Sequence, residues 1–223
     1  MVTSNSFGYG TPAIADWNHD GYDDVVITDY NATVGGQTDA GQVILFRGSP
    51  TGLTAIGGRV INQNSAGVPD VAEVDDNFGY LGSTTGDFNR DGRPDLAVVT
   101  EYESVGADTY AGVFHTFPGT ATSIGTTGAK LFTQDTAGIP GAVTANTYFG
   151  GDTIWSGDFN GDGFSDLVVP CGYCVVAGIN NAGYTIVLRG SASGVTGVGA
   201  RQIKRSSTPG EADVADTYFG TGY

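Results

Sequence analysis

The sequence predicts an all-β protein built from three copies of one four-stranded unit. The 223 residues include 37 glycines, 11 tyrosines and 11 phenylalanines, and stretches rich in strong helix formers are nearly absent. This composition is typical of short strands joined by many turns. A nine-residue acidic motif also begins at Asp16, Asp87 and Asp158, a constant spacing of 71 residues, and an apolar run follows each copy. A fixed period of this kind indicates a repeating architecture.

The motif places oxygen-bearing side chains where a hard cation needs them. Its three copies read Asp-Trp-Asn-His-Asp-Gly-Tyr-Asp-Asp, Asp-Phe-Asn-Arg-Asp-Gly-Arg-Pro-Asp and Asp-Phe-Asn-Gly-Asp-Gly-Phe-Ser-Asp. Side-chain oxygens at positions 1, 3 and 5, a main-chain carbonyl at position 7 and a turn-forming glycine at position 6 are similar to the first part of an EF-hand loop. An EF-hand continues to a Glu at position 12 and a helix, whereas here an Asp at position 9 precedes a β-branched run. The loop therefore joins two strands.

These loops are predicted to bind three Ca²⁺ ions per chain. The alternative is a polar turn that holds no ion, because Asp, Asn and Gly are common turn residues. Three copies in register favour calcium, since the carboxylates of each copy would otherwise repel one another. Arg90 and Arg93 should weaken the second site. The predicted ligands, with position 7 contributing its carbonyl, are Asp16, Asn18, Asp20, Tyr22 and Asp24; Asp87, Asn89, Asp91, Arg93 and Asp95; and Asp158, Asn160, Asp162, Phe164 and Asp166.

The charge balance excludes two classes of partner. The formal net charge is −15, from 24 acidic and 9 basic residues. Binding to nucleic acid or to an anionic membrane needs clustered Lys and Arg, so neither partner is expected. No apolar run is long enough to span a bilayer, and the first residues lack the basic and apolar segments of a signal peptide. Oxygen-ligand sites of modest affinity suit the millimolar calcium outside cells, which predicts a secreted protein.

The remaining elements of each unit follow in a constant order. A Phe-Gly pair (7–8, 78–79, 149–150, 219–220) precedes the first strand, and the acidic loop leads into the second. A third strand begins after a glycine (41–48, 112–119, 183–190), a fourth follows (59–63, 130–134, 201–205), and a Pro-bearing connection leads to the next Phe-Gly. Four strands per repeat form the blade of a β-propeller. The chain is thus predicted to be one propeller segment, 1–223, with blades at about 7–77, 78–148 and 149–218 and the start of a fourth.

The motifs of each unit, taken in order, resemble the FG-GAP repeat of integrin α-chain propellers. These motifs are Phe-Gly, then Gly-Asp-Phe-Asn-Gly-Asp-Gly-Phe-Ser-Asp-Leu-Val-Val, then Gly-x-x-x-x-x-x-Gly. The segment 133–141 resembles the connection between blades in secreted bacterial members of that family. The resemblance covers the whole chain. It implies calcium in the loop between the first and second strands of each blade and ligand contacts on the opposite face. Propellers of this family usually close with seven blades, whereas this chain supplies three. Either it is a segment of a longer protein, or two copies form a six-bladed ring, which we expect.

Catalytic signatures are scarce, so the protein is not expected to be an enzyme. No G-x-S-x-G motif is present, and His115 aligns with Ile44 and Ile186 on the third strand, where a packed histidine is expected. Cys171 and Cys174 are predicted to form a local disulfide. Half a zinc site, which lacks a second ligand pair, and a reduced cysteine pair are the alternatives.

The expected ligand face carries a recurring tyrosine, at Tyr30, Tyr102 and Tyr173, and Trp155 on a first strand can add a further ring. A tyrosine ring suits stacking on a sugar, although these rings could equally serve to pin glycine-rich loops. The sequence as a whole predicts a secreted, calcium-stabilised propeller that binds carbohydrate in the manner of a lectin. A protein-binding or oligomerisation module of integrin type and a polysaccharide lyase or hydrolase on the same scaffold are the alternatives.

Overall fold

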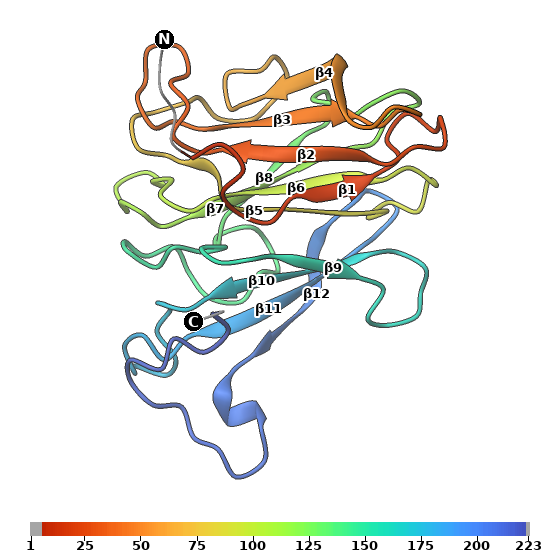
Figure 1. Ribbon diagram of the computed structural model, residues 1–223. Helices are drawn as coiled ribbons and strands as arrows, with labels where there is room; N and C mark the ends of the chain where they lie inside the picture. The colour runs from red at the N-terminus through yellow and green to blue at the C-terminus, as the bar shows by residue number, and fades with distance from the viewer. Residues whose placement is uncertain (1–5, 222–223) are drawn as a thin grey trace.

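The computed structural model describes residues 6–221, which form three four-stranded antiparallel sheets arranged one above the other (Figure 1). The described residues contain no α-helix, only a short 3₁₀ turn at Arg205–Ser207, and so no helix that could cross a membrane. The strands of the first sheet are β1 (Ala13–Ala15), β2 (Asp24–Asp29), β3 (Gln42–Arg47) and β4 (Thr54–Ile61); of the second, β5 (Phe78–Gly86), β6 (Asp95–Thr100), β7 (Val113–Phe117) and β8 (Lys130–Phe132); of the third, β9 (Trp155–Gly157), β10 (Asp166–Cys171), β11 (Tyr184–Arg189) and β12 (Thr196–Ile203).

Within each sheet the strands pair in the order of the sequence, as the blades of a β-propeller do. The predicted all-β fold of three four-stranded blades is confirmed. The fourth strands of the first and third sheets are longer than predicted, since they begin at Thr54 and Thr196, not at residues 59 and 201. These two strands continue through their glycines because the register shifts between Leu45 and Arg47 in the first sheet and between Val187 and Arg189 in the third.

The sheets pack face to face, with one apolar core between each neighbouring pair. Trp17, Val26 and Phe78 contribute to the core between the first and second sheets. Phe114, Phe149 and other apolar side chains fill the core between the second and third. Every residue of β6 and β7 is buried, because the central sheet is covered on both faces. This explains why the consecutive residues 96–99 of β6 are all apolar.

The Phe-Gly pairs join each sheet to the next. The N–H of Phe78 donates to the carbonyl of Ala40 at 2.9 Å, and that of Phe149 donates to Ala111 at 2.7 Å. Gly41, which precedes the third strand, has φ +87°, and a Cβ at this position would collide with the main chain of Phe78. Only glycine fits there, so the repeated glycine before each third strand marks the point where the next blade attaches.

His115 is a packed residue at the boundary between the first and second sheets. It is fully buried, its ring lies against Phe78 and Phe117, and its Nε2 is 3.2 Å from the carbonyl of Pro69. Burial lowers the pKa of His115 to about 4, so the ring is neutral in the folded protein at physiological pH.

Candidate metal centre

The three acidic loops join β1 to β2, β5 to β6 and β9 to β10, and they share the right-hand edge of the molecule in Figure 1. The position 1 aspartate organises each loop by accepting hydrogen bonds from the N–H groups of positions 5 and 6. In the first loop Asp16 accepts from Asp20 at 3.1 Å and from Gly21 at 2.9 Å. The same two bonds recur in the second and third loops at 2.9 to 3.1 Å. The chain therefore curls around this carboxylate in all three copies.

Positions 3 and 5 continue the same pattern. In the third loop the Oδ1 atom of Asn160 accepts from the N–H of Asp162 at 2.8 Å, and the Oδ1 atom of Asp162 accepts from the N–H of Phe164 at 2.9 Å. The position 6 glycine of that loop, Gly163, has φ +88°, which the sharp turn requires. The N–H groups, of which that of Gly163 contributes most, hold the pKa of Asp158 below its usual range, so this carboxylate stays ionised.

The position 9 aspartates are buried and fasten each loop to the end of the third strand. Asp24 accepts from the N–H of Trp17 at 3.2 Å and from that of Gly48 at 2.9 Å. Its Oδ2 also lies 2.6 Å from Nη1 of Arg47. In the third sheet Asp166 accepts from the N–H of Gly190 at 3.0 Å and pairs with an arginine that occupies the same place as Arg47.

The second loop lacks this arginine, a difference that sequence reasoning missed although Phe-Arg-Gly, Phe-Pro-Gly and Leu-Arg-Gly align. Pro118 stands in its place, and Asp95 accepts only from the N–H groups of Gly119 and Phe88, at 2.7 and 3.0 Å. Burial raises the pKa of Asp95 to about 6; the two N–H bonds oppose this shift, and neighbouring aspartates add to it. The closing carboxylate of the second loop thus has no cationic side chain to neutralise it.

The residues present in these loops fit a calcium ion. Each loop offers three carboxylates, an amide oxygen and a main-chain carbonyl, all of them the hard donors that Ca²⁺ prefers. A carboxylate oxygen that accepts one N–H keeps a second lone pair for a cation, whereas Oδ1 of Asp158 accepts two N–H groups and Oδ2 of Asp24 accepts one and pairs with Arg47. In none of the three loops, all of which the structure describes, do three acidic side chains approach one another within 4.8 Å, however. Among residues 6–221, the three carboxylates that lie within 4.8 Å of one another are Glu73, Asp76 and Glu103, outside the loops.

The two arginines of the second loop have different contacts. Arg93 pairs with the carboxylate of Asp91 at 3.2 Å, and both side chains are exposed. Arg90 reaches the third loop, where its Nη1 donates to the carbonyl of Asp162 at 3.1 Å and its guanidinium lies 5.8 Å from the ring centroid of Phe164. Of the two arginines, only Arg93 thus pairs with a predicted ligand carboxylate of its own loop. The weaker calcium affinity of this loop stays a prediction.

The opposite edge of the molecule carries a continuous row of tyrosine rings, which we call the tyrosine row. Tyr30, Tyr102 and Tyr173, singled out from the sequence, lie in the loops between second and third strands, but they do not stand alone. Four further tyrosines beside the Phe-Gly pairs separate and flank them: Tyr9, Tyr80, Tyr148 and Tyr218. From Tyr30 through Tyr80, Tyr102, Tyr148 and Tyr173 to Tyr218, successive ring centroids are 4.7, 5.6, 5.6, 5.0 and 5.0 Å apart.

The four additional rings had a signal in the sequence. Phe7-Gly8-Tyr9 and Phe78-Gly79-Tyr80 place the tyrosine after the pair, whereas Tyr148 and Tyr218 precede theirs. The rings are half-buried or exposed, and most of these contacts are edge to face, the arrangement that aromatic quadrupoles favour. Burial raises the pKa of Tyr102, so its phenol stays protonated.

Trp155 and the two cysteines lie apart from this row. Trp155 is on β9, opposite Val168 of β10, with 45% of its surface exposed. Cys171 and Cys174 are joined by a disulfide, but both are buried in the core between the second and third sheets. The Nε2 atom of Gln134 lies 3.1 Å from the Sγ atom of Cys174. The disulfide is therefore part of a packed boundary and is not available to a ligand.

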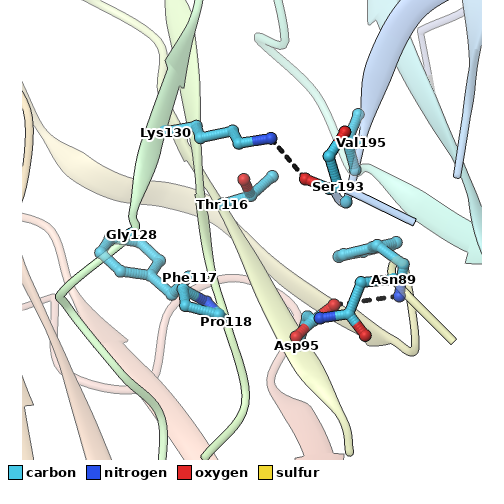
Figure 2. Close-up of a pocket in the computed structure, with 11 residues that line it drawn as sticks. Asn89, Asp95, Thr116, Phe117, Pro118, Gly128, Lys130, Ser193 and Val195 are labelled. Carbon is cyan, nitrogen blue, oxygen red and sulfur yellow. Dashed lines mark hydrogen bonds between the residues drawn. The ribbon is translucent and has the colours of Figure 1, made fainter. Parts of the chain in front are cut away.

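A cavity between the second and third sheets is lined by Asp95, Asn89 and other residues (Figure 2). Lys130 crosses its rim and donates to the carbonyl of Ser193. Its volume of about 40 Å³ is enough for water but far too small for a sugar ring. A wider hollow of about 700 Å³ lies beside the first acidic loop and is lined by Asn18, Asp20 and Arg47, among other residues, so it is not on the edge that carries the tyrosine row.

A comparison with known families matches the second sheet. Residues 78–117 fit a family model described as FG-GAP repeat. The match runs from the beginning of β5 to the end of β7 and so includes the second acidic loop and the glycine before the third strand.

Proposed function

This chain carries an FG-GAP repeat of the integrin-like propeller family, and on that premise we propose that it is a secreted, calcium-stabilised binding module whose ligand is carbohydrate. The three acidic loops would hold calcium at one edge, and the tyrosine row would receive the sugar at the other. The single observation that carries the proposal is the unbroken row of phenol rings across all three sheets.

Several physical properties of the row support a sugar ligand. A tyrosine presents a flat apolar face, which can stack on the C–H face of a sugar ring, and a hydroxyl that can donate to or accept from sugar hydroxyls. Because the rings brace one another, their side chains lose little further freedom when a ligand binds. The spacing of 4.7 to 5.6 Å between neighbouring centroids makes the row continuous, which suits an extended chain of sugars better than a single residue.

Binding to a glycan array is the direct test. We expect calcium-loaded protein to bind a limited set of glycans, and replacing the most exposed ring of the row in the variant Tyr9→Ala to weaken that binding about tenfold, a loss of about 1.4 kcal/mol. Phe159→Ala is the matched control, because Phe159 is also exposed and lies on the acidic-loop edge, at a position that supplies no predicted ligand. Absence of glycan binding both with calcium and with chelator would remove the proposal, as would equal binding by Tyr9→Ala and the native chain.

We propose further that a second copy of the chain is a partner. The outer face of the first sheet exposes Ile14 and Val60, and that of the third exposes Trp155, although the corresponding faces of the central sheet are buried. Exposed apolar sheet faces are typical of interaction surfaces. A head-to-tail pair would cover both and give a ring of six sheets, within the range of closed propellers.

Native mass spectrometry and light scattering measure this association. We expect a species of twice 22.8 kDa, and the variant Ile14→Arg should shift it to the single chain because it places a charge in the proposed contact. A native chain that remains at 22.8 kDa and melts cooperatively would contradict the six-sheet ring.

A further inference from the structure

A second kind of acidic site lies between the first and second sheets, beneath the connection 62–77 that leads from β4 to β5. The carboxylate oxygens of Glu73, Asp76 and Glu103 lie within 4.8 Å of one another. Asp76 and Glu103 are each only 3% exposed, whereas Glu73 is exposed and leaves one side open to solvent. None of the ion pairs formed among the described residues includes these three acids.

A buried amide without a full set of partners points into this group. Gln63 is 1% exposed, and its Nε2 donates to Oε2 of Glu103 at 2.6 Å. The Oε1 atom of the same planar amide is buried with no hydrogen-bond partner. A buried carbonyl oxygen without a hydrogen bond destabilises the folded chain by about 1–3 kcal/mol, so this arrangement of the Gln63 amide is unfavourable. A half-turn of the amide would direct this oxygen toward the carboxylates, which is favourable when a cation lies among them or when one of them is protonated.

The boundary between the second and third sheets has uncharged residues at the corresponding positions. A shift of 71 residues carries Gln63 to Gln134, Asp76 to Thr147 and Glu103 to Cys174. There the Oε1 atom of Gln134 accepts from Thr147 at 3.4 Å, its Nε2 donates to the phenol oxygen of Tyr184 at 2.6 Å, and the cysteine is in the disulfide. The glutamine of that boundary thus has partners for both ends of its amide, and the group is neutral. At the boundary between the first and second sheets, acidic residues occupy two of these positions instead.

We propose that Gln63, Glu73, Asp76 and Glu103 form a calcium site that fastens the connection between the first and second sheets. Three carboxylates and an amide oxygen are hard donors, and calcium accepts six to eight oxygens in a flexible arrangement, with water able to complete the shell from the exposed side. Asp76 and Glu103 are each only 3% exposed, and their carboxylate oxygens lie within 4.8 Å of each other. The pair is therefore unfavourable in the charged form until a cation neutralises it.

The number of bound calcium ions separates this site from the acidic loops. We expect equilibrium dialysis followed by elemental analysis to show one ion fewer per chain in the variant Glu103→Gln than in the native chain at pH 8. This difference does not depend on how many ions the loops hold, so the loops and the new site can fail independently. Thr147→Val, at the corresponding neutral position, is the matched control and should leave the count unchanged.

Thermal melting provides the second readout. In chelator, Glu103→Gln should melt at or above the temperature of the native chain, because it removes a buried negative charge. In calcium, the native chain should gain more stability than the variant. Equal ion counts in the two chains, or equal calcium-dependent shifts in melting temperature, would overturn the site and indicate that a proton neutralises the acids. Should Glu103→Gln not fold, Asp76→Asn is measured in the same way.

Discussion

Removal of calcium is expected to lower the free energy of unfolding by about 2.7 kcal/mol for each acidic loop, when free calcium had been at a hundredfold its Kd. An ion bound only by the folded chain stabilises that state, and its loss leaves the loop carboxylates to repel one another. Chemical denaturation in calcium and in chelator measures the difference. Restoring excess calcium should recover the original stability.

Asp162→Asn isolates the contribution of one loop. The asparagine oxygen can still accept the N–H of Phe164, as Asp162 does at 2.9 Å, so the turn is retained while a ligand charge is lost. The variant should match the native chain within about 0.5 kcal/mol in chelator and lose about 2–3 kcal/mol relative to it in calcium. A native chain whose stability does not respond to chelator would show that the loops are polar turns without an ion.

Replacing Phe149 by alanine is expected to lower the free energy of unfolding by about 3–5 kcal/mol, the cost of removing a large aromatic side chain from a packed core. Phe149 is fully buried between the second and third sheets, and its ring centroid is 5.9 Å from that of Phe114. The cavity left behind would weaken the contact between two sheets, since this residue belongs to one and packs on the other. Urea denaturation monitored by circular dichroism gives the loss.

Phe159→Ala is the matched control. Phe159 follows the first aspartate of the third loop and is 58% exposed, so its removal should change the free energy of unfolding by about 0.5 kcal/mol or less. Similar losses for the two variants would mean that the sheets are not held together by the Phe-Gly side chains.

The repeated features of the fold could be predicted from the sequence because they are local. The acidic loop, the glycine before the third strand and the Phe-Gly pair each act through main-chain geometry within a few residues or through one contact to the neighbouring unit. Gly41 shows this directly, since its position in the repeat predicts a strand start and the structure adds that Phe78 leaves no room for a side chain. A period of 71 residues was therefore sufficient to predict four strands in each sheet, but not that β4 and β12 begin at Thr54 and Thr196.

Features that depend on differences between repeats could not be predicted in the same way. Pro118 looks like a minor change within an aligned motif, and only the structure shows that it removes the arginine partner of a buried aspartate. The group around Glu103 brings together residues 40 positions apart, Gln63 and Glu103, across a sheet boundary. No pattern along the chain indicates such a contact, because side-chain packing between sheets determines it.

The contact from Arg90 to the third loop has a consequence for how the molecule would respond to a rising ion concentration. Arg90 holds the carbonyl of Asp162, a loop residue two positions before the predicted carbonyl ligand, so ordering either loop lowers the entropic cost of ordering the other. The first loop has His19, not an arginine, at the position of Arg90. If the loops hold calcium as proposed, binding in the second loop should favour binding in the third, whereas binding in the first should be independent of both.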